Sequence, residues 1–68
     1  MIAKLEIFNL QKKNRKTVFV HAYSVEDAVE KMRENYPSRE WGLESALHAL
    51  DVEKEECLKN NEDVVEIY

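Results

Sequence analysis

Apolar and polar positions alternate along the first part of the chain and change to a helical period at Ser24. Alternate positions of residues 17–23 are apolar, as on the buried side of a strand. Beyond Ser24, apolar residues recur at the spacing of an amphipathic helix, namely Val25, Ala28, Val29, Met32 and Tyr36. The pattern predicts a strand at 17–23 that runs directly into a helix at 24–35.

The ends of this predicted helix are marked by capping chemistry. Ser24 can accept a hydrogen bond from a backbone N–H of the first turn, and Asp27 stands three residues on, as in a capping box. Tyr23 and Ala28 occupy the two positions of a hydrophobic staple. Pro37 ends the helix, because the residue before a proline is disfavoured in the helical region.

Two further segments are typical of strands. Residues 2–10 read as a strand in which Ala3, Leu5 and Ile7 alternate with polar residues, and Phe8 and Leu10 break that alternation. A polar hairpin loop at 11–16 joins this segment to the strand at 17–23. Residues 63–68 are predicted to end the chain as a short strand.

Residues 39–50 fit two periods. Four apolar residues keep the spacing of a helix that Ser38 would cap (Leu43, Ala46, Leu47 and Leu50), whereas alternate residues suit a strand (Trp41, Leu43, Ser45, Leu47 and Ala49). We expect the helix, because Glu, Ala and Leu favour that state, although Gly42 costs ~1 kcal/mol inside it. A further helical segment is predicted at 52–59, with Cys57 and Leu58 as its apolar contacts.

These elements predict a single α+β domain over residues 1–68. Their order is strand, strand, helix, helix, strand, which gives an antiparallel sheet of three strands with the helices packed on one face. One cysteine allows no internal disulfide, and no Cys/His spacing typical of zinc is present. A partner protein, or a second copy in a homodimer, is therefore a reasonable source of extra stability.

The motifs argue against several classes of function. With a single glycine the chain has no Gly-rich phosphate loop, and we expect neither an enzyme nor a bound cofactor or metal. Residues 1–10 hold no long apolar run, so we expect neither a secretory leader nor a membrane span. The lone Cys57 fits a reducing cytoplasm, and His21 and His48 stand beside no nucleophile or metal signature.

The net charge of −4 is distributed unevenly. Residues 1–23 carry five basic residues against one acidic residue, whereas residues 24–68 carry five basic against thirteen acidic. The acidic residues crowd the last part of the chain: Glu40, Glu44, Asp51, Glu53, Glu55, Glu56, Glu62, Asp63 and Glu66. A dense negative surface can engage a basic patch on another protein, including a protein that binds nucleic acid.

We therefore predict a protein-binding surface in the C-terminal half. Its candidate residues are two aromatics of the kinds enriched in binding hot spots and five glutamates: Tyr36, Trp41, Glu40, Glu44, Glu53, Glu55 and Glu56. Tyr36 and Trp41 are equally candidates for the core. Phe19 and Tyr68 are candidates for exposed aromatics on the other face of the sheet, and an open sheet face or edge invites strand or dimer pairing.

The alternative is a nucleic-acid-binding module that uses the basic hairpin loop 12–16. On a hairpin tip, Lys12, Lys13, Arg15 and Lys16 can reach phosphates. Against this alternative, the loop contains no aromatic residue for base stacking, and the acidic remainder of the chain would repel a phosphate backbone.

The segment TVFVHAYSVEDA at residues 17–28 follows a short strand and leads to Tyr36-Pro37. It resembles the strand-to-helix junction of many small phage-borne and mobile-element proteins of ββα type. Several of those proteins are accessory factors that inhibit bacterial defence, among them anti-CRISPR proteins. The resemblance covers about a third of the chain and carries over no functional residue. It implies a compact, non-catalytic, partner-binding protein, and we expect an inhibitor of a larger complex, such as a nucleic-acid-binding defence complex.

Overall fold

The computed structural model describes residues 1–60 and 63–68. Within them the chain forms four strands and two helices: β1 (Ile2–Asn9), β2 (Arg15–His21), α1 (Val25–Asn35), β3 (Trp41–Ala49), α2 (Asp51–Asn60) and β4 (Val64–Ile67). The apolar pattern of the segment 52–59 breaks at Asn60-Asn61, and the second residue of that pair and the acidic residue Glu62 fall outside the described residues.

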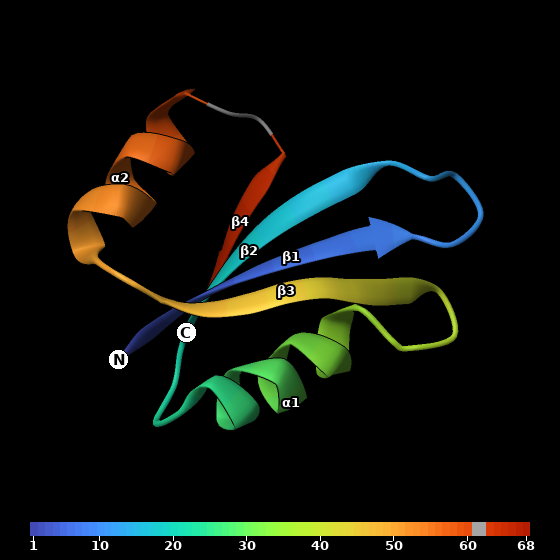
Figure 1. The fold of residues 1–68 in the computed structure, drawn as a ribbon, viewed down its shortest axis with the longest axis horizontal. Coiled ribbons are helices and arrows are strands. Elements are labelled where there is room, and N and C mark those ends of the chain that lie inside the picture. Colours follow the sequence, from blue (N-terminus) through green and yellow to red (C-terminus); the bar gives the residue numbers. More distant parts are fainter. Residues whose placement is uncertain (61–62) are drawn as a thin grey trace.

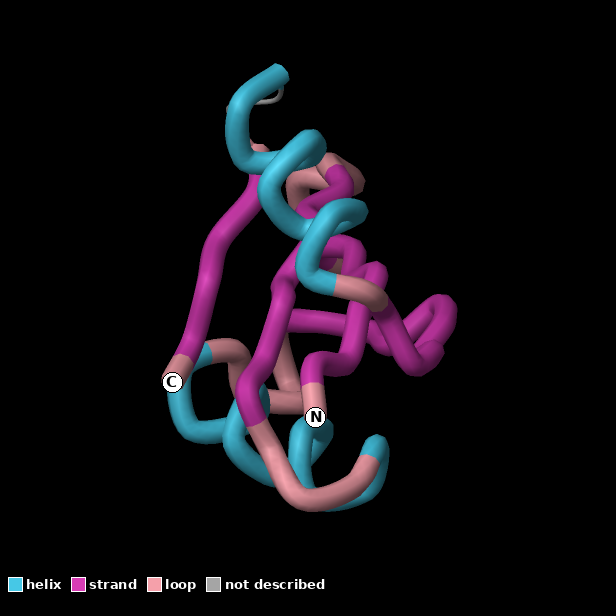
Figure 2. The backbone as a smooth tube through the Cα atoms, turned by 90° about the vertical axis from the view of Figure 1, so that its left-hand side faces the viewer, coloured by secondary structure: helices cyan, strands magenta, loops and turns pink. Residues whose placement is uncertain are grey.

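The strands form one mixed sheet in the order β3-β1-β2-β4 (Figure 1). β1 pairs antiparallel with both β2 and β3, whereas β4 pairs parallel with β2. α1 packs on one face of the sheet and α2 on the other, so the strands lie between the two helices (Figure 2). The predicted α+β class is confirmed, but the prediction of three antiparallel strands with both helices on one face is wrong.

The main departure from the sequence prediction is β3, which occupies most of the segment 39–50 that we expected to be a helix. Local spacing suited both states, and pairing with β1 over its whole length decides for the strand. Trp41 also meets Tyr36 edge to face, with ring centroids 5.2 Å apart. Gly42, which is unfavourable in a helix, lies opposite Phe8, and a Cβ at position 42 would stand 2.3 Å from Phe8 Cζ.

The main core lies between the sheet and α1. Alternate residues of β1 and β2 point to this face, and Ala28 and Met32 of α1 close it. The predicted cap is confirmed, because Ser24 Oγ accepts a hydrogen bond from the Asp27 N–H at 3.0 Å. The Asp27 carboxylate in turn accepts from the Tyr23 N–H at 3.1 Å. Tyr23 is 96% exposed, so the predicted hydrophobic staple is wrong.

A smaller core lies on the other face, beneath α2. Ile2, Phe19 and Ala49 are buried there, and Cys57 of α2 and Val64 of β4 pack against them. The sequence placed Phe19 on this face correctly, but its prediction as an exposed aromatic is wrong, because α2 covers it. The predicted packing role of Cys57 is confirmed.

Candidate functional site

The charged residues of α2 lie on two faces of the helix, one turned towards the sheet and one turned away from it. Glu53, Lys54 and Cys57 lie on the side of the helix that faces the sheet. Glu53 Oε2 accepts a hydrogen bond from Lys4 Nζ at 3.1 Å, and Lys54 Nζ donates to Glu66 Oε2 at 2.9 Å. At 3.6 residues per turn, five of the other seven residues form a separate outward face, made of Asp51, Val52, Glu55, Glu56 and Lys59. All five are exposed.

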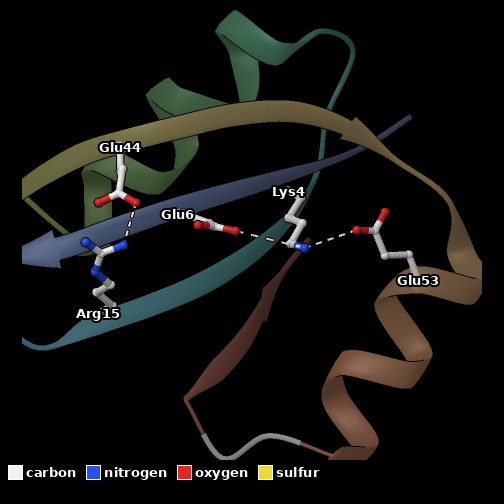
Figure 3. A network of polar contacts seen from close by, with 5 residues as sticks. All are labelled: Lys4, Glu6, Arg15, Glu44 and Glu53. Carbon is white, nitrogen blue, oxygen red and sulfur yellow. Dashed lines mark hydrogen bonds and ion pairs between the residues drawn. The ribbon is translucent and has the colours of Figure 1, made fainter.

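The inward carboxylate of α2, Glu53, is neutralised by a lysine of the sheet. Lys4 stands between Glu53 at 3.1 Å and Glu6 at 4.0 Å (Figure 3). The hydrogen bond to Glu53 raises the pKa of Lys4 above its usual value, against the opposing effect of burial. No such ion pair is found for Glu55 or Glu56 in the part of the chain that the structure describes. The outward face of α2 therefore presents negative charge that the fold itself does not use.

Apolar side chains are exposed where β3 runs into α2. Leu47, Leu50 and Val52 are 61%, 69% and 64% exposed, and they lie within six consecutive residues. α2 itself buries no residue fully. Apolar groups left in water beside carboxylates are the composition of an interface centre with a charged rim.

The predicted site residues are not all brought together. Glu40 precedes β3 and Glu44 is its fourth residue, whereas Glu53, Glu55 and Glu56 lie on α2, which follows the far end of that nine-residue strand. Such a strand spans roughly 25–30 Å. Glu44 Oε1 also accepts a hydrogen bond from Arg15 at 2.6 Å, across the sheet (Figure 3). The structure thus divides the predicted acidic surface into two parts.

The two predicted aromatic anchors are parts of the fold. Tyr36 and Trp41 are partly buried against the main core, and burial raises the pKa of Tyr36. Arg33 of α1 donates to the backbone carbonyl oxygens of Tyr36 at 3.3 Å and Trp41 at 2.6 Å. These contacts fix the connection between α1 and β3, so the rings support the α1 end of β3.

The hairpin tip combines basic residues with an aromatic ring that the sequence did not place there. An open hollow of about 400 Å³ is lined by Phe8, Asn9, Leu10, Lys13, Arg15 and Glu44. Lys13 has a left-handed backbone (φ 60°). Lys12 is exposed in the loop, and Lys16 is half-buried within β2. The signal for Phe8 was its break in the alternation of the first strand.

Glu66 of β4 is the centre of a polar cluster. Its Oε2 lies 2.6 Å from His21 Nε2 and 2.9 Å from Lys54 Nζ. These two hydrogen bonds lower the pKa of Glu66 to about 2. Tyr68 is 80% exposed, as predicted, and its ring stacks on that of His21 at a centroid distance of 4.4 Å. The cluster ties four-residue β4 to β2 and α2, and sequence spacing could not reveal contacts 45 residues apart.

The fold and these surfaces define a small α+β protein with a four-stranded mixed sheet and one helix on each face. Comparisons with protein-family models, curated proteins and solved structures found no match to this chain. Within residues 1–60 and 63–68, no group of three or more His, Cys, Asp or Glu side chains could hold a metal ion. Neither helix in that part of the chain is long and apolar enough to cross a membrane.

Proposed function

We propose that this chain is a non-catalytic protein-interaction module whose contact surface is the outward face of α2. The observation that carries the proposal is the division of charge on this helix. Glu53 and Lys54 are paired with the sheet, while Asp51, Glu55 and Glu56 face solvent around Val52. The fold needs the first group, and the second is free to meet a partner.

The charge and apolar content of this face indicate what kind of partner surface it fits. Carboxylates around an apolar side chain match a surface with Lys and Arg at its rim and a shallow apolar centre. Basic surfaces of that kind are typical of proteins that hold nucleic acid. A chain that covers such a surface would compete with the nucleic acid, so the proposed role is that of an inhibitor of a larger complex.

Charge reversal on the outward face tests the proposal. We expect Glu55→Lys with Glu56→Lys to weaken partner binding at least about tenfold, and the loss to shrink as salt is raised, because screening already weakens the wild-type contact. The partner is first isolated with tagged protein from lysate of the source organism after nuclease treatment, and then titrated in purified form at several salt concentrations.

The matched control is the double variant Glu30→Lys with Glu34→Lys. It makes the same change of charge at two exposed positions one turn apart on α1. The proposal requires the partner to be retained by this control and lost by the α2 variant. Equal affinity of both variants for the purified partner would remove α2 as the contact surface.

The second candidate function is nucleic-acid binding at the hairpin tip, and the position of Phe8 favours it. The ring lines the same hollow as Lys13 and Arg15, so a stacking surface and phosphate-binding cations lie together. Arg15 is engaged by Glu44, which leaves the lysines as the main contacts.

For this second function we expect Lys12→Ala, Lys13→Ala and Lys16→Ala together to reduce the affinity for a single-stranded oligonucleotide. The number of counterions released on binding, given by the slope of log affinity against log salt concentration, should fall by about two to three. Fluorescence anisotropy at low salt measures both quantities. Lys59→Ala, on exposed α2, is the control that should leave binding unchanged. If the intact protein does not bind DNA or RNA at low salt, the second candidate is rejected.

A further inference from the structure

β3 is an edge strand whose outer side pairs with no other strand of the described chain. It is the longest strand, with nine residues, and contains no Lys, Arg or Pro. Edge strands in natural proteins are usually protected by such residues, by bulges or by a covering segment. The protection of β3 therefore has to come from a bulge or from a covering segment.

The first part of the edge is closed by the chain itself. The N–H of Trp41 donates to Pro37 O at 2.9 Å, and its carbonyl oxygen accepts from Arg33 at 2.6 Å. Beyond Trp41, the register against β1 shifts by one residue opposite Glu6 and Ile7. Ser45 to Ala49 then form a regular run, and the edge remains open there.

The direction of the backbone groups in this run follows from β1. Odd-numbered residues of β1 form their backbone hydrogen bonds with β2, and the Asn9 N–H continues this pattern by donating to Asn14 O. The even-numbered residues therefore form theirs with β3, and the Leu10 N–H likewise donates to Glu40 O. Glu6, Lys4 and Ile2 therefore bond to their partners Ser45, Leu47 and Ala49. The backbone groups of Ala46 and His48, which stand between these partners, point out to the open edge.

This edge is complementary to itself. If two antiparallel copies of β3 meet around a twofold axis at Leu47, Ala46 of each copy stands opposite His48 of the other, and the outward groups of both residues form hydrogen-bonded pairs. Leu47 then faces its own counterpart in the closer, non-hydrogen-bonded position. Its side chain is 61% exposed in the single chain.

Other registers fit less well. An axis at Ala46 or His48 also satisfies the outward backbone groups, but it sets Leu47 opposite Ser45 or Ala49 of the second copy. Only the axis at Leu47 buries the exposed leucine against another leucine. A domain of 68 residues has a small core, so an added apolar contact and four backbone hydrogen bonds are a substantial gain.

We propose that the chain forms a homodimer through antiparallel pairing of the Ser45–Ala49 run of β3 with the same run of a second copy. The two sheets join into one of eight strands. Because the twofold axis is perpendicular to the sheet, both α2 helices lie on the same side of the dimer. This inference is independent of the proposed function, which concerns the outward face of α2.

The test is the oligomeric state of Leu47→Lys. We expect the wild type to sediment as a dimer at micromolar to millimolar concentrations and Leu47→Lys to sediment as a monomer, because two like charges then meet directly across the axis. Leu10→Lys places the same charge at a similarly exposed leucine of the hairpin loop and should remain a dimer. Circular dichroism checks that each variant is folded.

Amide hydrogen exchange of the wild type tests the interface without any substitution. The amide protons of Ala46 and His48 should become protected as the protein concentration rises, while those of Ser45, Leu47 and Ala49 are protected throughout. A wild type that stays monomeric over this range overturns the proposal. So does a dimer in which Ala46 and His48 exchange freely, since that dimer uses another surface, or a folded Leu47→Lys variant that remains a dimer.

Discussion

Phe19→Ala should leave the chain largely unfolded at 25 °C. The Phe19 side chain is fully buried between the sheet and α2, where it is the largest member of the smaller core. Truncation of a buried phenylalanine costs about 3–5 kcal/mol in free energy of unfolding. A domain of this size has a core worth about the same amount. Thermal or urea unfolding followed by circular dichroism measures the change.

Tyr23→Ala is the control for this prediction. Tyr23 is 96% exposed, and its removal should change the free energy of unfolding by no more than about 0.5 kcal/mol. If Phe19→Ala instead unfolds at the wild-type midpoint, α2 does not cover the second face of the sheet, and Phe19 would be the exposed aromatic that the sequence suggested.

The parts of the fold that the sequence predicted correctly are those specified by neighbouring residues. Ser24 marks the change of period and caps α1, and both features lie within a few residues of each other. β3 could not be predicted in this way, because its residues fit both a helix and a strand. Its pairing with β1 joins Ile2 to Ala49, and no local pattern reports a contact at that separation.

The candidate surface was only partly predictable for a similar reason. The sequence identified a run of acidic residues but not their partners, and Lys4 and Arg15 neutralise Glu53 and Glu44 from distant strands. One signal was available locally. Once Cys57 is taken as the residue that packs on the core, the helical period places Glu53 on its side of α2, and Glu55 and Glu56 on the other.

Glu66→Gln should destabilise the protein at neutral pH by about 1–2 kcal/mol, since the variant keeps the shape of the side chain but removes the charge that binds His21 and Lys54. The loss should be greatest in β4, which has only four residues and is attached to the sheet along one edge. Chemical unfolding measures the total change, and amide exchange in β4 locates it. Glu55→Gln removes the same charge from an exposed position and should have almost no effect.

Acid titration distinguishes this electrostatic contribution from simple packing. Because the pKa of Glu66 is lowered from 4.5 to about 2 in the folded protein, its charge contributes stability that is fully present above about pH 4.5 and is lost as the pH falls towards 2. The stability difference between wild type and Glu66→Gln should therefore shrink across this window, while Glu55→Gln follows the wild type. A difference that stays constant from pH 5 to about 2 would show that the glutamine perturbs packing, and that the charge of Glu66 does not hold β4 in place.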